Sequence, residues 1–263
     1  MKLCLFLLIV QVTASAQWLH YREPGIPRTK DGKPDLAAAA PKTHDGKPDL
    51  SGIWDPAVEV QDLGDEKAPV PSLFLDITHG VKPGDAAMLP AAQGLFDQRR
   101  REHDAGDPLA NCKPIGVPRV EFSPSPIRIV QSQSLVVVLH EAETSFREIH
   151  VDGRALPDDP QPAWMGYSTA KWEGDTLVVE TAGFPDNGWL DAFGHPHSDS
   201  LRLTERIRRS DFGHMEIRIT IDDPKMYRKP FTSTQKYNLV PDSDLIEYFC
   251  TENERDSRHY VIK

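Results

Sequence analysis

The stretch between Ala182 and Leu201 concentrates the polar side chains that can do chemistry. An imidazole titrates near neutral pH and a neighbouring carboxylate fixes its tautomer, so a histidine oriented by an aspartate is a candidate general base. A loop of this length inside a compact domain is more often functional than not. Its candidate residues are Asp186, Trp189, Asp191, His195, His197 and Asp199, with Asp191 or Asp199 as the orienting group.

His195 and His197 also suggest a metal site. They flank a proline, and in an extended chain the two rings fall on the same side, as two metal ligands require. A cupin-like site would need a carboxylate four or five residues after the second histidine, where the chain has Leu201 and Arg202. Metal binding is therefore the weaker alternative, and no cofactor is expected.

Alternation along the predicted strands gives a second candidate site. In the strand expected over 201–208, Glu205 shares the apolar face with Leu203, and Arg147 lies on the apolar face of the strand expected over 144–151. A charge on a buried face must be paired, neutral or functional, which makes Arg147 the natural counter-ion of Glu205. The pair is either a structural salt bridge or part of a ligand site inside a barrel.

Ser168 is close to a nucleophile elbow in the run Gly166-Tyr-Ser-Thr-Ala170. That elbow requires a turn from a strand into a helix, whereas Ser168 begins a predicted strand. The sequence contains no phosphate-binding loop, dinucleotide fingerprint, paired CxxC or HExxH motif.

The elements that must position these residues are mostly strands. From Ile127 on, short apolar runs with period 2 alternate with turn residues, which is typical of antiparallel sheet. The expected strands are 127–131, 134–140, 144–151, 167–172, 176–182, 201–208, 214–221, 232–239 and 245–250. Closure protects so many edges most simply, so we predict an all-β, antiparallel up-and-down, lipocalin-like barrel over 127–263, with a two-sheet sandwich as the alternative.

The preceding segment, 17–126, is predicted to be an irregular arm that packs on the barrel. It holds 15 of the 23 prolines, too many for mostly regular structure. It also contains a duplicated turn, 29–36 and 43–50, with Gly32 and Gly46 in the turns. One short helix is expected from Ala91 to about His103.

The N-terminus predicts the compartment. Residues 1–16 have a charged start, a short apolar run and a small-x-small cleavage site, which is typical of a secretory signal peptide. The mature chain is expected to be secreted or periplasmic, with Cys112 and Cys250 as a disulfide. The alternatives are two free thiols or a metal site, which would need more ligands nearby. The formal net charge of −10 disfavours nucleic acid and anionic membranes as partners and leaves small molecules.

Several motifs resemble those of an uncharacterised family of secreted bacterial proteins. They are Trp172-Glu-Gly-Asp-Thr-Leu-Val-Val-Glu-Thr181, Gly183-Phe184, Trp189-Leu-Asp191, His197-Ser-Asp199, Thr204-Glu-Arg206, Asp222-Asp-Pro224 and the opening run Asp45 to Trp54. The resemblance covers the chain from about Thr43 to the end. It implies secretion and no particular activity.

The leading functional hypothesis is a secreted enzyme that performs general acid/base chemistry on a small organic molecule, of lyase, isomerase, cyclase or hydrolase type. The catalytic set is His197, Glu205, Asp199 and Arg147. The substrate-binding candidates are Trp164, Trp189, Asp191, His195, Gln131 and Tyr167, the two tryptophans as a stacking wall or as plugs of the barrel ends. The alternatives are a lipocalin-like carrier and a wall or matrix component docked through the arm.

Overall fold

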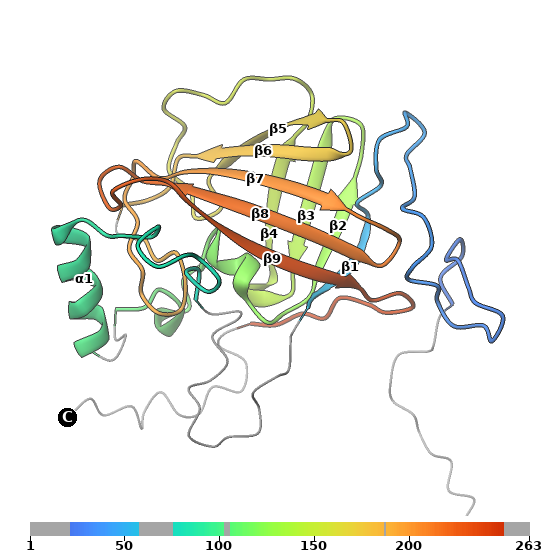
Figure 1. Ribbon diagram of the computed structural model, residues 1–263, viewed down its shortest axis with the longest axis horizontal. Coiled ribbons are helices and arrows are strands. Elements are labelled where there is room, and N and C mark those ends of the chain that lie inside the picture. Colours follow the sequence, from blue (N-terminus) through green and yellow to red (C-terminus); the bar gives the residue numbers. More distant parts are fainter. Residues whose placement is uncertain (1–21, 58–75, 103–105, 187, 250–263) are drawn as a thin grey trace, which may run out of the picture.

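The chain forms a closed, mainly antiparallel β-barrel in which each strand pairs with its neighbour in sequence (Figure 1). The computed structural model describes residues 22–57, 76–102, 106–186 and 188–249. The strands are β1 (Gly52–Pro56), β2 (Ile127–Gln131), β3 (Leu135–His140), β4 (Ser145–His150), β5 (Tyr167–Glu173), β6 (Thr176–Ala182), β7 (Arg202–Arg209), β8 (His214–Asp222) and β9 (Phe231–Leu239). The prediction of an all-β barrel is confirmed.

The barrel interior is the hydrophobic core, and the period-2 pattern explains which side chains fill it. In β8, Ile217, Ile219 and Ile221 are buried, while the alternate residues face outward. The same alternation in β7 buries Leu203 together with Glu205. Because β-branched side chains pack well on a pleated surface, these strands are stabilised by the face that they bury.

The strand that closes the barrel is β1, and the predicted strand 245–250 is wrong. β1 pairs with β2 on one side and with β9 on the other. After β9 the chain turns at Asp242, whose φ is 60°, and residues 245–249 run without a strand along the outside. There the backbone N–H of Tyr248 donates to Thr144 instead of to a neighbouring strand.

The pairing of β4 with β5 is parallel, so the prediction of antiparallel pairing throughout was wrong at this one place. Only Ile149 with Ser168 and His150 with Thr169 are paired. A tight hairpin would reverse the direction of the chain. The long connection 151–166, which contains three prolines, instead brings the chain back beside the end of β4, where β5 begins. β5 therefore continues in the direction of β4.

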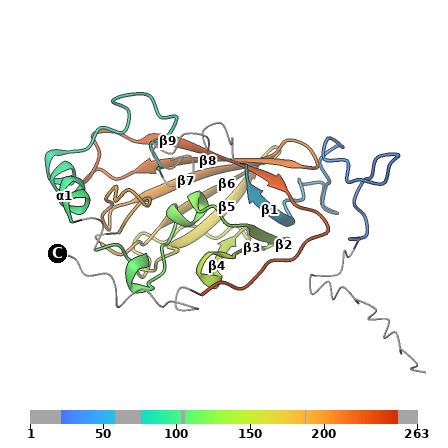
Figure 2. The same ribbon diagram turned by 90° about the horizontal axis from the view of Figure 1, so that it is seen from below.

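Helix and loops gather at one end of the barrel, and the N-terminal segment lies at the other, as both views agree (Figure 1, Figure 2). α1 (Pro90–Arg101) begins with proline and ends in three arginines, close to the predicted bounds. The three short 3-10 turns are η2 (Leu109–Asn111), η3 (Arg119–Phe122) and η4 (Ala142–Thr144). No helix in the described ranges is long and apolar enough to cross a membrane.

The duplicated turns dock on the barrel end opposite α1. Gly32 and Gly46 have φ of 82° and 78°, a region that glycine adopts without strain, which confirms their predicted place in the turns. The N–H of Gly213, in the β7–β8 turn, donates to the carbonyl of Leu36 in the first copy. The predicted signal peptide and Cys250, the predicted partner of Cys112, lie outside the described residues, so both stay predictions.

Candidate active site

Asp191 organises the loop between β6 and β7. Its side chain is fully buried and each carboxylate oxygen accepts two hydrogen bonds. Oδ1 accepts from the backbone N–H of Phe193 at 3.0 Å and of His195 at 3.1 Å. Oδ2 accepts from the N–H of Ile77 at 3.0 Å and bonds Nδ1 of the His195 ring at 2.5 Å. One buried carboxylate thus fixes this loop, the segment 76–89 and an imidazole together.

The Asp191 carboxylate also fixes the tautomer of His195. An ionised carboxylate only accepts, so Nδ1 carries the hydrogen and Nε2 keeps the lone pair of a base. The ring is 8 % exposed, stacks on Phe96 of α1 at 4.6 Å between centroids, and lines a pocket of about 260 Å³. Within the described chain Nε2 has no hydrogen-bond partner, which leaves it to a ligand.

The wall of this pocket comes from the segment 76–89, which sequence reasoning missed. The other lining residues are Thr78, Val81, Lys82, Pro83, Gly84, Ala86 and Ala87. The segment is held against the β8–β9 loop because the N–H of Leu89 donates to Met226 and that of Arg228 donates to Ala87. It has no sequence periodicity, and its position depends on contacts with residues far along the chain, so the sequence offered no signal for it.

Trp189 is part of the framework that supports the loop. It is 4 % exposed, with the guanidinium of Arg99 4.8 Å and that of Arg119 5.7 Å from its ring. Arg99 also donates to the carbonyls of Gly188 and Gly194, at 3.2 and 3.0 Å, which ties α1 to the loop. Trp164, the other predicted member of the stacking wall, is half-buried, and its backbone lies against Gly116, so the wall stays a prediction.

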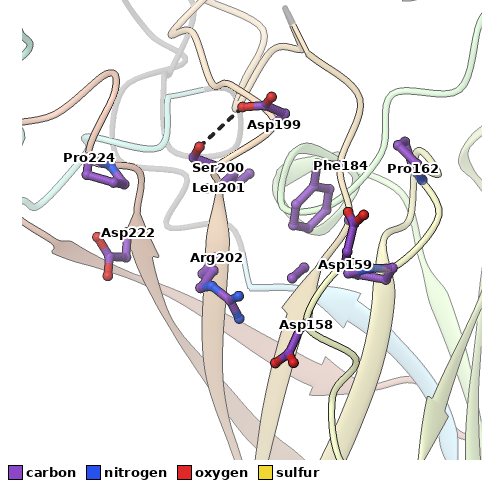
Figure 3. A pocket seen from close by; sticks show the side chains of 13 residues that line it. Asp158, Asp159, Pro162, Phe184, Asp199, Ser200, Leu201, Arg202, Asp222 and Pro224 are labelled. Carbon is purple, nitrogen blue, oxygen red and sulfur yellow. Dashed lines mark hydrogen bonds between the residues drawn. The ribbon is translucent and has the colours of Figure 1, made fainter.

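His197 and Asp199, the predicted base and its orienting group, are not brought together. His197 is buried, its Nδ1 lies 3.1 Å from the carbonyl of Ser198, and burial lowers its pKa. Asp199 is exposed, forms an ion pair with Lys225 at 2.5 Å and accepts from Ser200 at 3.2 Å (Figure 3). Residues 199–200 form a turn in which the N–H of Leu201 donates to the carbonyl of Ser198, so Asp199 points to the surface while His197 packs inward.

Asp199 lies instead on a second pocket, of about 530 Å³, between the segment 158–162 and the start of β7 (Figure 3). The charged residues that line it are one arginine, Arg202, and four aspartates, which are Asp158, Asp159, Asp199 and Asp222 (Figure 3). Apart from Asp199, these residues form no ion pair within the described ranges. The described residues that line the pocket include no histidine, serine–histidine pair or other group suited to proton transfer near neutral pH.

Arg147 and Glu205 meet inside the barrel as the face analysis predicted. The guanidinium donates through Nη1 to Oε1 of Glu205 at 3.0 Å and through Nη2 to Oε2. It also donates to Glu121 at 2.9 Å, Ser168 at 3.1 Å and Thr181 at 2.8 Å, so all five N–H groups are used. Glu121 comes from η3, and no periodicity in that segment pointed to it.

Protonation keeps this interior cluster neutral. Burial, and then the charge of Glu205, raise the pKa of Glu121 to about 8, against the lowering effect of Arg147. At neutral pH Glu121 is thus protonated while Arg147 and Glu205 cancel. Burial lowers the pKa of His140 to about 3, and neither of its ring nitrogens has a hydrogen-bond partner in the part of the chain that the structure describes. Arg147 and Glu205 are 2 % and 0 % exposed, so a dissolved substrate does not reach them in this conformation.

The remaining predicted binding residues support loops. Gln131 accepts from the N–H of Leu50 at 2.8 Å and donates to the carbonyl of Pro48 at 3.0 Å, which holds the second duplicated turn. The hydroxyl of Tyr167 accepts from Arg154 at 3.1 Å, and its ring lies 5.3 Å from that of His150.

The predicted His195–His197 metal pair is not formed as a ligand group among the described residues. Donor atoms within 4.8 Å of one another belong instead to Asp76, Asp191 and His195. Asp191 already accepts four hydrogen bonds, and a metal ion would have to displace some of them. The arrangement therefore fits an aspartate–histidine dyad better than a metal centre.

No family model matches the chain, and no curated protein matches it.

Proposed function

We propose that the protein is an enzyme that performs general acid/base chemistry on a small organic molecule, with His195 as the base and Asp191 as its positioning residue. The observation that carries the proposal is the 2.5 Å bond between Asp191 Oδ2 and His195 Nδ1, with the ring on a pocket. A carboxylate at Nδ1 selects the tautomer that is basic at Nε2 and stabilises the imidazolium formed when Nε2 takes a proton.

In this proposal the catalytic base is not one of the four residues that the sequence suggested, His197, Asp199, Glu205 and Arg147. The interior cluster of Arg147 and Glu205 is a neutral, hydrogen-bonded core element with no access for a substrate. His197 has little room at Nε2, because the backbone of Gly188 lies directly against it. His195 differs from both because its ring lies at a pocket surface and its orientation is fixed by a charged partner.

The non-catalytic carrier is the weaker candidate for two reasons. The inward-facing side chains of the barrel pack as core, which leaves the interior to protein atoms instead of a ligand. A carrier site also has no need of a buried carboxylate that polarises an imidazole. A reaction that begins with proton removal from carbon, as in a lyase or isomerase, or from water, as in a hydrolase, uses both members of the dyad.

The test is proton exchange catalysed by the full secreted chain. A panel of small carboxylic acids, amides, esters and lactones is incubated with the protein in D₂O, and deuterium incorporation or product formation is followed by NMR. His195→Asn keeps a donor near the Nδ1 position and removes Nε2. We expect it to lower the rate by about 10²- to 10⁴-fold. His197→Asn, the matched control on the same loop, is expected to retain activity.

Asp191→Asn tests the positioning role. It keeps the size of the side chain but removes the charge, so we expect a lower kcat and a shifted pH–rate profile, with the fold checked by circular dichroism. Full activity in His195→Asn would overturn the proposal. Compounds that bind the wild-type protein and are all recovered unlabelled and unchanged would favour the carrier.

A further inference from the structure

The pocket beside His195 combines one positive charge with apolar walls. Among the residues that the structure describes, Lys82 is the only charged one in the lining apart from the titratable His195. The other side chains are those of Thr78, Val81, Pro83, Ala86 and Ala87. The carboxylates of Asp76 and Asp191 lie close to His195 but do not line the pocket. A ligand there meets a cation, methyl or ring carbons, and the oxygen of the Thr78 hydroxyl, whose hydrogen is donated to Asp76 at 2.6 Å.

Lys82 takes part in no ion pair among residues 22–57, 76–102, 106–186 and 188–249. The nearby Asp85 is bonded to Lys229 at 2.6 Å, which is its main counter-ion, and the charge of Lys82 adds a weaker coulombic effect on that carboxylate. Lys225, an exposed lysine that follows Pro224 of the acidic pocket in the sequence, is likewise paired with Asp199. Lys82 thus keeps its ammonium group for a ligand, on the surface of an otherwise acidic protein.

We infer that this pocket binds a small organic carboxylate, with Lys82 holding the charged end and the apolar walls holding the body. A single lysine is a point charge that matches a monoanion, whereas a phosphate carries up to two charges and usually recruits more donors. The volume of about 260 Å³ lies just below the range of about 300–1,000 Å³ usual for small-molecule sites, which favours a compact ligand.

This inference deepens the proposed function, on which it rests, by naming the substrate class. A carboxylate held by Lys82 leaves the rest of a short molecule beside the His195 ring, where Nε2 can take a proton from it. Lys82 then determines specificity and His195 performs the chemistry. The two roles belong to different side chains, so they can be separated by experiment.

The experiment is an NMR titration of the full secreted chain with benzoate, its neutral analogue benzamide, the cation benzylamine, and inorganic phosphate. The signals are those of the His195 ring, assigned with His195→Asn, and of the Lys82 side chain. We expect benzoate to shift both sets at lower concentration than the other three probes. Lys82→Gln should weaken the binding of benzoate about 5-fold, and Lys82→Glu should weaken it more. The binding of benzamide should be unaffected by both variants. Lys225→Gln, which removes the same charge elsewhere, should change nothing.

Several results would overturn the inference. These are equal binding of benzoate and benzamide, stronger binding of benzylamine or phosphate, no shift at His195, and unchanged benzoate binding in both Lys82 variants. Failure of the proposed function gives a different pattern. In that case benzoate binds with the expected dependence on Lys82. It also still binds to His195→Asn, as the backbone amide signals of residues 78–87 would show, but the protein catalyses proton exchange in no carboxylate.

Discussion

Arg147 on β4 and Glu205 on β7 form a bidentate ion pair in the barrel interior, although β5 and β6 lie between their strands in the sheet. Both side chains are almost completely buried. Burial removes water from both charges, so each depends on the other for its stability.

Arg147→Met is therefore expected to lower the free energy of unfolding by about 3–5 kcal/mol, because it leaves the Glu205 carboxylate buried without its counter-ion. The double variant Arg147→Met/Glu205→Leu should lose less than the single one. Urea unfolding at pH 7 measures both. The control Arg154→Met removes an exposed guanidinium paired with Asp152 and should cost no more than about 0.5 kcal/mol. A double variant that is no more stable than Arg147→Met would contradict the pairing argument.

Stability should depend on pH through Glu121. Its pKa is raised to about 8 in the fold from 4.5, so between these values the folded chain holds a proton that the unfolded chain has lost. Stability from this group is complete below pH 4.5 and falls as the pH rises to about 8, by up to about 1.4 kcal/mol per unit. Glu121→Gln should abolish the fall between pH 6.5 and 8 in urea unfolding. An unchanged slope in that variant would refute the assignment.

His140 acts in the opposite direction at lower pH. Its pKa falls to about 3 from 6.5, so its contribution is complete above pH 6.5 and is lost as the pH falls towards 3. The slopes of His140 and Glu121 therefore oppose each other between pH 4.5 and 6.5. His197, whose pKa burial also lowers, adds to the His140 slope, so wild-type stability should rise with pH there less steeply than stability of Glu121→Gln. In Glu121→Gln the His140 slope should emerge, with stability rising with pH up to 6.5.

Replacing His140 by an apolar residue should not destabilise the protein. Its ring is buried and neither nitrogen has a partner, so the fold bears an uncompensated desolvation cost of about 1–3 kcal/mol. His140→Leu or His140→Phe is expected to be neutral or stabilising in thermal unfolding at pH 7. A loss above 2 kcal/mol in both variants would mean that the imidazole has a bound partner in solution.

Gly188 is expected to tolerate no side chain. A Cβ atom there would lie 1.8 Å from Nε2 of His197, so Gly188→Ala must displace the ring and the loop that carries Asp191. We expect a loss of about 1–3 kcal/mol in urea unfolding. Removing the ring in Gly188→Ala/His197→Ala should relieve the clash. Gly94→Ala, in α1 with open space around its Cβ position, should instead be neutral or slightly stabilising.

The sequence was sufficient to predict features that depend on local patterns. The alternation around Ile217 and Ile219 predicted the buried face of β8, and the same rule brought Arg147 and Glu205 inside. Asp191 and His195 are four residues apart, so their contact lies within the reach of a single turn. These interactions require only the geometry of one strand or one loop.

Features that depend on distant contacts could not be predicted. Lys82 lines the site because its segment is anchored to the β8–β9 loop, and Glu121 reaches the interior from an irregular turn. The run at β1 is short and lies among prolines, so its strand character comes from two neighbours that bind it on both sides. Asp199 was assigned to His197 by proximity in sequence, but Lys225 attracts it to the surface.

The short ladder between β4 and β5 gives the Arg147 cluster a second structural role, which is to hold the barrel closed. Only two residue pairs join these strands, against eight between β7 and β8. Arg147 spans that junction, since it belongs to β4 and donates to Ser168 on β5, Thr181 on β6 and Glu205 on β7. The Arg147 side chain thus connects four strands of the barrel at the junction with the fewest backbone pairs. The backbone amides of the β4–β5 junction should therefore be the first in the barrel to exchange with solvent deuterium. Their exchange rate reports how often β4 separates from β5 and opens the barrel.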